Sequence, residues 1–367
     1  MLNLRGTLLS SMRLPLILPW LLICAIGCGA PGAPLPPSLG IPKPVGDLKA
    51  VRKADTVTLK WSSPTETTDG ELIRKTGKMA VLRSLSGGNV PADWKTISQL
   101  ALPPALKDAA PASQEQNDAV GPLLDSGADF AAYSVLAQSG SGRGAGASNQ
   151  AAVALVPTPA TPARVSAVAE PSGISLSWDQ PWTPQNHSQL IVQYSYRIMR
   201  REEGSKNAVV VKEVSIGNQA MALIDTGMEW QKHYEYWIVP VTTWRGSGKK
   251  GEVEGQDSQM VQVFANDVFP PAVPTALEAV FSGIAGQPSI DLSWTPDMEP
   301  DLAGYNVYRH EDNQSAVKIN SDLVKSSSFQ DQQVRPGTKY YYSVSAVDLR
   351  GNESGRSTEA AETVPPQ

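Results

Sequence analysis

The chain has 367 residues, which is too long for one ordinary domain and long enough for two or three. Its formal charge of −5 argues against nucleic acid as a partner, because phosphate binding needs a basic surface. Both cysteines, Cys24 and Cys28, lie near the N-terminus, so the rest of the chain has no disulfide, thiolate metal site or cysteine nucleophile.

Residues 1–27 are predicted to be an export signal. Arg5 and Arg13 make the start of this segment positive, and residues 14–26 form an apolar run of 13 residues. A bilayer-spanning helix needs about 20 residues, so the run suits the hydrophobic region of a signal peptide better than a permanent membrane span.

The sequence AIGC, residues 25–28, resembles the lipobox of bacterial lipoproteins. The resemblance implies cleavage before Cys28 and attachment of acyl chains such as palmitate to it, which would anchor the protein to a membrane. Gly29, where an aspartate would retain the protein at the inner membrane, favours the outer membrane of the bacterial cell envelope. An ordinary secretory signal with an incidental cysteine is the alternative.

Residues 28–41 follow as a tether rich in proline and glycine. Proline-rich chain rises about 3.1 Å per residue, so the Pro/Gly-rich residues 29–44 would reach up to ~50 Å from the bilayer. The tether therefore predicts that the folded part stands away from the membrane.

One alternating strand that ends in tryptophan recurs three times in the remaining chain. Its copies are VTLKW, ISLSW and IDLSW, which end at Trp61, Trp178 and Trp294. Alternation at period two places the apolar side chains on one face, as in a half-buried antiparallel strand. We expect the three tryptophans to lie in equivalent hydrophobic cores.

Two further strand patterns follow each tryptophan, and a proline-rich joint precedes each copy. The second pattern is MAVLR, YRIMR or YNVYR, and the third is YSVLA, YWIVP or YSVSA. This repetition predicts three domains of about the size of a seven-stranded sandwich, here called domain 1 (42–157), domain 2 (158–267) and domain 3 (268–367).

The landmarks of domains 2 and 3 resemble those of the fibronectin type III family. In domain 3, LSW, GYNVYR and RPGTKYYYSVSAVDLRGNES are similar to the family's central strands and their loops, and Tyr340 stands at the tyrosine corner. Tyr234 takes that position in domain 2. The resemblance implies an all-β chain of three tandem fibronectin type III-like, immunoglobulin-like sandwiches.

Domain 1 departs from this pattern. Ala131 stands where the family has the corner tyrosine, and residues 84–128 form an insertion rich in alanine and proline. We expect a short helix around residues 92–102. Domain 1 is therefore predicted to be a divergent sandwich, or one that is extended on one flank.

The sequence indicates no catalytic residue, metal or cofactor. Its three histidines have no metal-ligand spacing, and GSGRGAG at 140–146 is explained by a flexible loop between strands. Asp297, Glu299 and Asp301 alternate as calcium ligands can, but a solvated acidic loop accounts for them better. In LRGNES, at 349–354, Asn352 replaces the aspartate of an integrin-binding loop, and Gly351 suits a turn with positive φ.

One surface is a candidate for binding. Tyr234 and its alternate neighbours should point inward, which turns Trp237 and Val239 outward beside Met199 of the adjacent strand. Exposed apolar patches of this kind often mark partner surfaces, although the insertion of domain 1 or a neighbouring domain would also account for the patch.

Loop aromatics of domain 2 suggest a second kind of site. Trp182 and Trp244, with Lys249 and Lys250, are predicted to lie in loops where they would stack on sugars. The sequence thus predicts a non-catalytic envelope lipoprotein that binds a protein partner or acts as a spacer or scaffold. A carbohydrate-binding accessory protein that contacts polysaccharide is the alternative.

Overall fold

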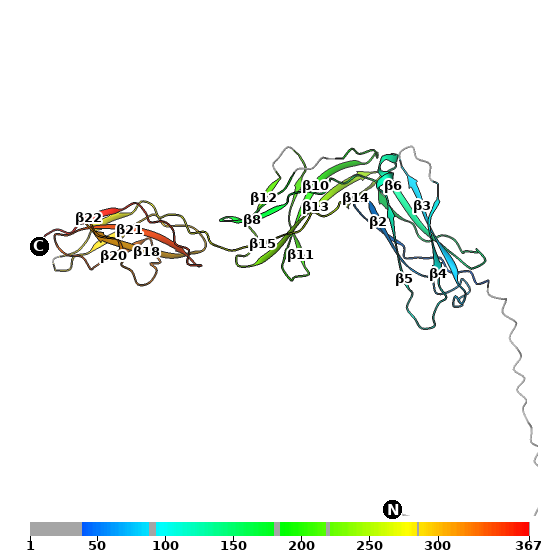
Figure 1. Cartoon of the computed structure of the whole chain (residues 1–367), viewed down its shortest axis with the longest axis horizontal. Coiled ribbons are helices and arrows are strands. Elements are labelled where there is room, and N and C mark those ends of the chain that lie inside the picture. Colours follow the sequence, from blue (N-terminus) through cyan, green and yellow to red (C-terminus); the bar gives the residue numbers. More distant parts are fainter. Residues whose placement is uncertain (1–38, 88–92, 180–183, 218–220, 285, 367) are drawn as a thin grey trace, which may run out of the picture.

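The computed structural model describes residues 39–87, 93–179, 184–217, 221–284 and 286–366. The predicted signal peptide, Cys28 and most of the tether lie outside these residues. The described chain is built from β-strands and one short 3₁₀ helix, η1, so the predicted all-β fold class is confirmed. Figure 1 shows three sandwiches that follow one another in chain order, with a bend between the first and the second.

Domain 1 packs a sheet of order β4-β3-β6-β7 against strands β1, β2 and β5. The elements are β1 (Lys49–Lys53), β2 (Thr56–Ser62), β3 (Gly77–Ser86), β4 (Lys95–Leu102), β5 (Ser113–Ala119), η1 (Gly121–Ser126), β6 (Phe130–Gln138) and β7 (Ala151–Ala154). On β2, Val57, Leu59 and Trp61 are buried and alternate with more exposed residues. The period-two pattern therefore produces the half-buried strand that the sequence predicts.

The predicted helix around residues 92–102 is wrong, because Lys95–Leu102 form strand β4. Met79 of β3 pairs with Leu100, and Ala80 pairs with Gln99. Leu102 is fully buried in the core of domain 1. The apolar spacing of this segment resembles that of a helix, but pairing with the edge of β3 satisfies its backbone and buries its apolar residues.

Domain 2 packs a sheet of order β12-β9-β8 against strands β11, β10, β13 and β14, with β15 also paired to β13. The strands are β8 (Ser166–Glu170), β9 (Gly173–Ser177), β10 (Ile191–Glu202), β11 (Ala208–Ser215), β12 (Ala222–Asp225), β13 (His233–Gly246), β14 (Lys249–Glu254) and β15 (Val261–Phe264). Trp178 packs in the core, where its ring meets that of Tyr196 edge to face.

Domain 3 packs a sheet of order β16-β17-β20 against a sheet of order β19-β18-β21-β22. The strands are β16 (Glu278–Phe281), β17 (Ile290–Ser293), β18 (Leu302–Glu311), β19 (Val317–Lys318), β20 (Ser328–Asp331), β21 (Lys339–Asp348) and β22 (Ala360–Thr363). Trp294 meets Tyr305 edge to face inside this core.

Both tyrosines at the expected corner positions are buried and close a loop. The hydroxyl of Tyr340 accepts a hydrogen bond of 3.0 Å from the backbone N–H of Arg335. The hydroxyl of Tyr234 accepts one of the same length from the N–H of Glu229. Each bond ties the start of a central strand to the turn that precedes it.

A largely buried group of an arginine, an aspartate and a tyrosine recurs in all three domains. In domain 3, the Asp331 carboxylate accepts hydrogen bonds from Arg309, at 2.7 Å, and from the hydroxyl of Tyr342, at 2.8 Å. The equivalent groups are Arg200, Asp225 and Tyr236 in domain 2, and Arg83, Asp118 and Tyr133 in domain 1. Domain 1 thus shares this polar arrangement although it lacks the corner tyrosine.

Burial, reinforced by the hydrogen bond to the aspartate, raises the pKa of all three of these tyrosines well above its ordinary value. Their hydroxyls therefore stay protonated and keep donating to the carboxylates. The sequence repeat of the strands therefore extends to this polar group.

A single sheet continues from domain 1 into domain 2. Lys53 of β1 pairs in parallel with Glu254 of β14, and the backbone N–H of Ala54 donates a 2.7 Å hydrogen bond to the carbonyl of Glu254. The order β11-β10-β13-β14-β1-β2-β5 therefore crosses the boundary between the two domains. Backbone pairing of this kind restricts the angle between the domains.

Candidate functional site

The predicted surface of domain 2 lies on the outer face of β10 and β13, where the register brings its residues together. Met199 stands directly opposite Trp237, and Val210 of β11 stands opposite Met199. Trp237 and Met199 are half-buried, whereas Val210 is 54% exposed. We call these three residues, Val210, Met199 and Trp237, the Trp237 row.

Val239 does not face solvent as predicted, since it is only 4% exposed. It lies directly opposite Arg197 in the register of β10 and β13. The Arg197 guanidinium reaches Glu252 and Glu254 on β14, with N–O distances of 3.0 Å to each. Because β13 lies between β10 and β14, the Arg197 side chain crosses β13 next to Val239.

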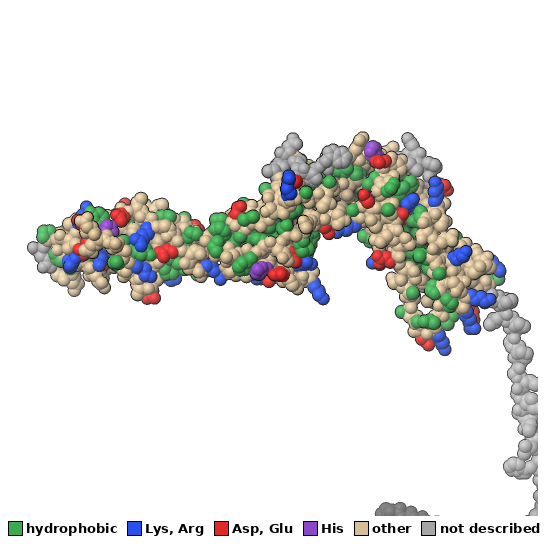
Figure 2. Space-filling model, viewed as in Figure 1, with side chains coloured by type: hydrophobic (Ala, Val, Ile, Leu, Met, Phe, Trp, Pro, Cys, Tyr) green, Lys and Arg blue, Asp and Glu red, His purple; other side chains and the backbone are tan. Residues whose placement is uncertain are grey.

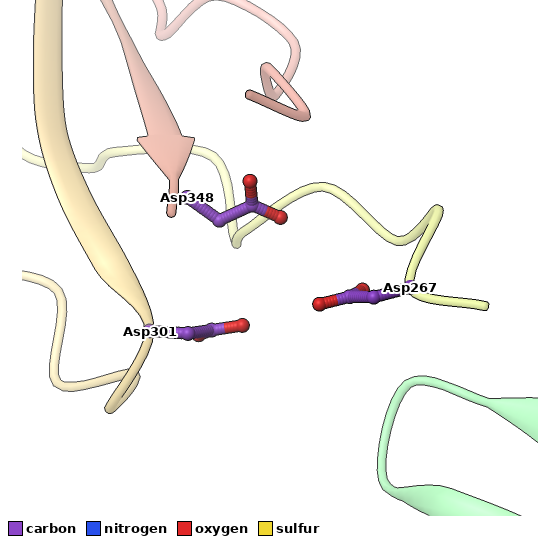
Figure 3. A group of neighbouring side chains, drawn as sticks. All are labelled: Asp267, Asp301 and Asp348. Carbon is purple, nitrogen blue, oxygen red and sulfur yellow. The ribbon is translucent and has the colours of Figure 1, made fainter. Parts of the chain in front are cut away.

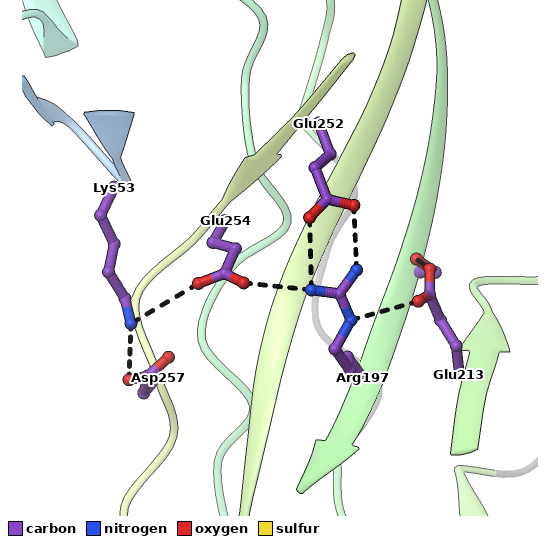
Figure 4. A network of polar contacts seen from close by, with 7 residues as sticks. Lys53, Arg197, Glu213, Glu252, Glu254 and Asp257 are labelled. Carbon is purple, nitrogen blue, oxygen red and sulfur yellow. Dashed lines mark hydrogen bonds and ion pairs between the residues drawn. The ribbon is translucent and has the colours of Figure 1, made fainter. Parts of the chain in front are cut away.

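Figure 4 shows this ion-pair network in full. Arg197 also pairs with Glu213 of β11 at 3.2 Å. On the other side, Lys53 of domain 1 pairs with Asp257 at 2.7 Å and approaches Glu254 at 3.9 Å. Charges from both domains thus cover the middle of this sheet face, and the Trp237 row is the apolar part that remains beside them.

A second arginine limits the exposure of Trp237. The Arg201 guanidinium lies over the Trp237 ring, 5.6 Å from its centroid, and its Nε donates a 2.8 Å hydrogen bond to Glu235. The space-filling view in Figure 2 shows apolar side chains gathered over part of the middle sandwich. The outer face of domain 2 is therefore a mixed surface, with an apolar row bordered by paired charges.

Sequence reasoning missed Val210 because its place in the row depends on pairing. Nothing in the local pattern AVVVKEVS says which valine meets Met199. A register shift between Ile198 and Met199 makes Val210 its partner. Only the observed register identifies the third member of the row.

The structure departs further from the prediction at the second candidate site, the sugar-stacking residues of domain 2. Trp244 lies on strand β13, and Lys249 and Lys250 lie on β14, rather than in loops as predicted. The Trp244 ring lies across Gly251, where a side chain at that position would collide with it. Trp182 falls outside the described residues.

Trp244 also belongs to the junction between domains 1 and 2. Its ring meets the ring of Phe130 of domain 1 edge to face, with centroids 5.3 Å apart, and the Lys249 ammonium lies 5.5 Å from the centroid of Phe130. Together with the buried side chains of Ala154, Val156, Leu190 and Val253, these rings form a small hydrophobic cluster between the domains. Trp244 and Lys249, two of the four residues of the predicted sugar-stacking site, thus contact domain 1.

A hollow of about 440 Å³ lies beside Trp244 on domain 2. Its lining comes from three adjacent strands and consists of Ile191, Gln193, Thr243, Trp244, Arg245, Lys250, Gly251 and Glu252. Most of these side chains are exposed, so the hollow opens to solvent. Its size and mixed lining are compatible with a small polar ligand or one unit of a polymer.

Three carboxylates meet at the other junction, between domains 2 and 3. Asp267 of the joint, Asp301 and Asp348 have oxygens within 4.8 Å of one another, and they come from three separate segments (Figure 3). Within the described ranges, they are the one group of three or more potential metal-ligating side chains of this type. Carboxylate oxygens are the ligands that Ca²⁺ prefers, although a calcium ion takes six to eight of them.

The environments of these aspartates differ. Burial, with repulsion from Asp348 and Asp301, raises the pKa of Asp267. Burial also disfavours ionisation of Asp348, but hydrogen bonds from Asn352 and from the N–H of Arg350 outweigh it and lower its pKa. Sequence reasoning found Asp301 but missed its neighbours, which are 34 and 47 positions away.

The other residues considered for chemistry lie apart. His187, His233 and His310 lie near Asp125, Glu203 and Glu359 respectively. Residues 140–146 connect β6 to β7 without a regular helix or strand, and Gly351 adopts a φ of +89°. No helix among the residues that the structure describes is long and apolar enough to cross a membrane.

Comparison with known proteins identifies the fold of the last domain. Residues 274–363 match the family model of the fibronectin type III domain, so the chain contains a domain of this family. A Fn3-like protein from Clostridium thermocellum, of known structure, is 35% identical over 27% of this chain and 98% of its own, with a TM-score of 0.23.

Segments of enzymes named amylopullulanase and alpha-amylase are also similar to this chain. An amylopullulanase of Thermoanaerobacterium thermosulfurigenes is 39% identical over 77 residues, which are 21% of this chain and 4% of that enzyme. An alpha-amylase of Niallia circulans is 33% identical over 118 residues, which are 32% of this chain and 8% of that enzyme. The similarity thus spans only a small part of each relative.

Proposed function

We propose that this protein is a non-catalytic lipoprotein of the bacterial cell envelope that holds a protein partner at a distance from the membrane. Acylated Cys28 would anchor it, and the proline-rich tether would lift domain 1 from the bilayer. Gly29 favours attachment to the outer membrane. The similarity to short segments of much larger enzymes supports an accessory role.

The observation that carries the proposal is the sheet that runs through domains 1 and 2. Backbone pairing at Glu254, the Lys53–Asp257 ion pair and the Phe130–Trp244 contact link the two domains at three points. A scaffold needs such a fixed geometry, since a flexible string of domains would not hold a partner at a defined distance. The Trp237 row is our candidate for the surface that the partner contacts.

The partner surface is tested by in-cell cross-linking, affinity capture and mass spectrometry with Trp237→Ala. Since Trp237 packs against Arg201, Val210→Ser provides a second variant in the same row at an exposed position. Leu349→Ala, at an apolar residue of domain 3 that is 71% exposed, is the matched control. We expect one cross-linked protein to be lost in both row variants and kept in the control; unchanged cross-links in all three would reject this surface.

The anchor is tested separately, by the mass of the mature N-terminus and by fractionation of Cys28→Ser. Acylation should add the mass of fatty chains to a protein that begins at residue 28. The variant should then leave the membrane fraction. An unmodified N-terminus would refute the lipoprotein proposal without affecting the scaffold role.

Carbohydrate binding is the second candidate, and two observations favour it. The relatives that match include amylopullulanases and an alpha-amylase by name, and the hollow beside Trp244 offers polar and apolar groups together. Retention on insoluble polysaccharide, measured with the wild type and with Gln193→Ala, tests it. If the hollow binds sugar, the variant should be retained more weakly than the wild type. If the protein is only a scaffold, neither the wild type nor the variant should be retained.

A further inference from the structure

The side chains of the hollow are arranged in two rows across three neighbouring strands. Ile191, Arg245 and Lys250 stand opposite one another on β10, β13 and β14, and Gln193, Thr243 and Glu252 form the next row. Directly opposite residues of paired strands point to the same face. The six side chains therefore share one face of the sheet.

The first row contains an unusual pair of charges. Arg245 and Lys250 lie opposite each other and both are exposed, and neither side chain has a hydrogen bond, ion pair or ring contact with the residues that the structure describes. Like charges in directly opposite positions destabilise a sheet. Glu252, the one acid of the lining, is already paired with Arg197 at 3.0 Å.

The protein as a whole is acidic, with a formal charge of −5, yet this hollow carries two unneutralised positive charges. A bound anion between Arg245 and Lys250 would relieve their repulsion and form charge-assisted hydrogen bonds. The charge of the hollow is therefore complementary to a negatively charged ligand.

The rest of the lining matches a sugar. Gln193 and Thr243 can both donate and accept hydrogen bonds, as the hydroxyls of a saccharide require. Ile191, which is 58% exposed, offers apolar contact for the C–H face of a pyranose. An acidic peptide would pair with the two cations, but it has fewer groups that could bond to the amide of Gln193 and the hydroxyl of Thr243.

We propose that the hollow binds a carboxylated polysaccharide, with Arg245 and Lys250 holding the carboxylate of a uronic acid unit. Gln193 and Thr243 bind hydroxyls of the same unit or its neighbour. This inference rests on the carbohydrate-binding candidate above and specifies its ligand class. It involves no covalent step.

The experiment measures the binding of the full-length protein, purified in a non-ionic detergent, to immobilised polygalacturonate, amylose and polyglutamate. Variants Arg245→Gln and Lys250→Gln remove one cation each. Lys206→Gln is the matched control, because Lys206 is exposed in the turn after the opposite end of β10. Thermal melting of each variant checks the fold, and we expect no loss of stability when either of two repelling charges is removed.

Polygalacturonate should bind more tightly than amylose or polyglutamate, and its affinity should fall with salt. Each hollow variant should weaken this binding about tenfold, as expected for the loss of one charge-assisted hydrogen bond, while Lys206→Gln should leave it unchanged. This pattern would support the proposal.

Other outcomes overturn it in distinguishable ways. Equal binding of polyglutamate would show that charge alone is recognised, and polygalacturonate binding that survives both hollow variants would place the site elsewhere. Binding of amylose alone would reject the uronate inference but keep the carbohydrate-binding candidate. If no saccharide binds, both fail and the scaffold role remains.

Discussion

The ring of Phe130 in domain 1 meets the ring of Trp244 in domain 2 edge to face, with centroids 5.3 Å apart. This contact packs beside the place where β14 joins the sheet of domain 1. The two domains are thus connected by side chains and by backbone hydrogen bonds together, which accounts for their fixed relationship.

Phe130→Ala should loosen this junction. The variant removes a partly buried ring and its contacts with Trp244 and Lys249, and we expect it to lower the free energy of unfolding by about 2 kcal/mol. Hydrogen exchange should accelerate at the amide of Ala54, which bonds to Glu254 across the boundary. Phe264→Ala is the control, since this half-exposed ring of domain 2 stacks on His233 instead; equal acceleration in both variants would contradict the prediction.

The buried polar group of domain 3 should depend more on its charge pair than on its tyrosine. Asp331→Asn leaves the largely buried Arg309 without its counter-charge, and we expect a loss of about 3 kcal/mol. Tyr342→Phe removes one hydrogen bond and should cost about 1 kcal/mol. Urea unfolding, monitored by hydrogen exchange in β21, measures both losses in the free energy of unfolding. Equal losses would show that the ion pair contributes no more than the tyrosine hydrogen bond.

Two aspartates at the second junction should respond in opposite directions to loss of charge. The raised pKa of Asp267 means that its ionisation destabilises the folded state, so stability falls as pH rises through that pKa. Asp267→Asn should therefore raise the melting temperature at pH 7. Asp348→Asn should lower it, because the pKa of Asp348 is lowered and its ionised form is stabilised in the fold.

Scanning calorimetry of the two variants provides the measurement. A lower melting temperature for Asp267→Asn would refute this prediction. If a chelator removed that loss, the carboxylate would have to be holding a cation.

His310 should make domain 3 more stable at mildly acidic pH. Its Nδ1 lies 2.8 Å from the carbonyl oxygen of Glu311 and its Nε2 lies 3.0 Å from a carboxylate oxygen of Glu359. Both partners are acceptors, so the doubly protonated ring fits best, and the bond to Glu311, followed by that to Glu359, raises the pKa of His310 above 6.5.

The contribution of a raised histidine pKa is fully present below the unfolded value of 6.5 and is lost as pH rises through the folded value. Wild type should therefore exceed His310→Gln in melting temperature by more at pH 5.5 than at pH 8.5. Glu359→Gln should reduce this difference in part. If the difference in melting temperature between wild type and His310→Gln does not vary with pH, His310 remains neutral.

The strands of this protein could be predicted from the sequence because their signal is local. Trp61, Trp178 and Trp294 close three alternating patterns, and each alternation becomes a strand with one buried face. The apolar spacing of residues 95–102 suits a helix, but pairing with β3 makes this segment a strand.

The candidate sites depended on register and on contacts between domains, which no local pattern encodes. Val239 has the right parity for an exposed face, yet it is buried beside Arg197, whose side chain crosses to β14. Trp244 has the composition of a sugar-stacking residue, yet domain 1 packs against it. Sequence alone determined three β-sandwiches and their cores, because a period of two residues places alternate side chains on opposite faces of a strand. Only the tertiary structure decided which outward faces stay exposed, because exposure depends on the segments that pack beside them.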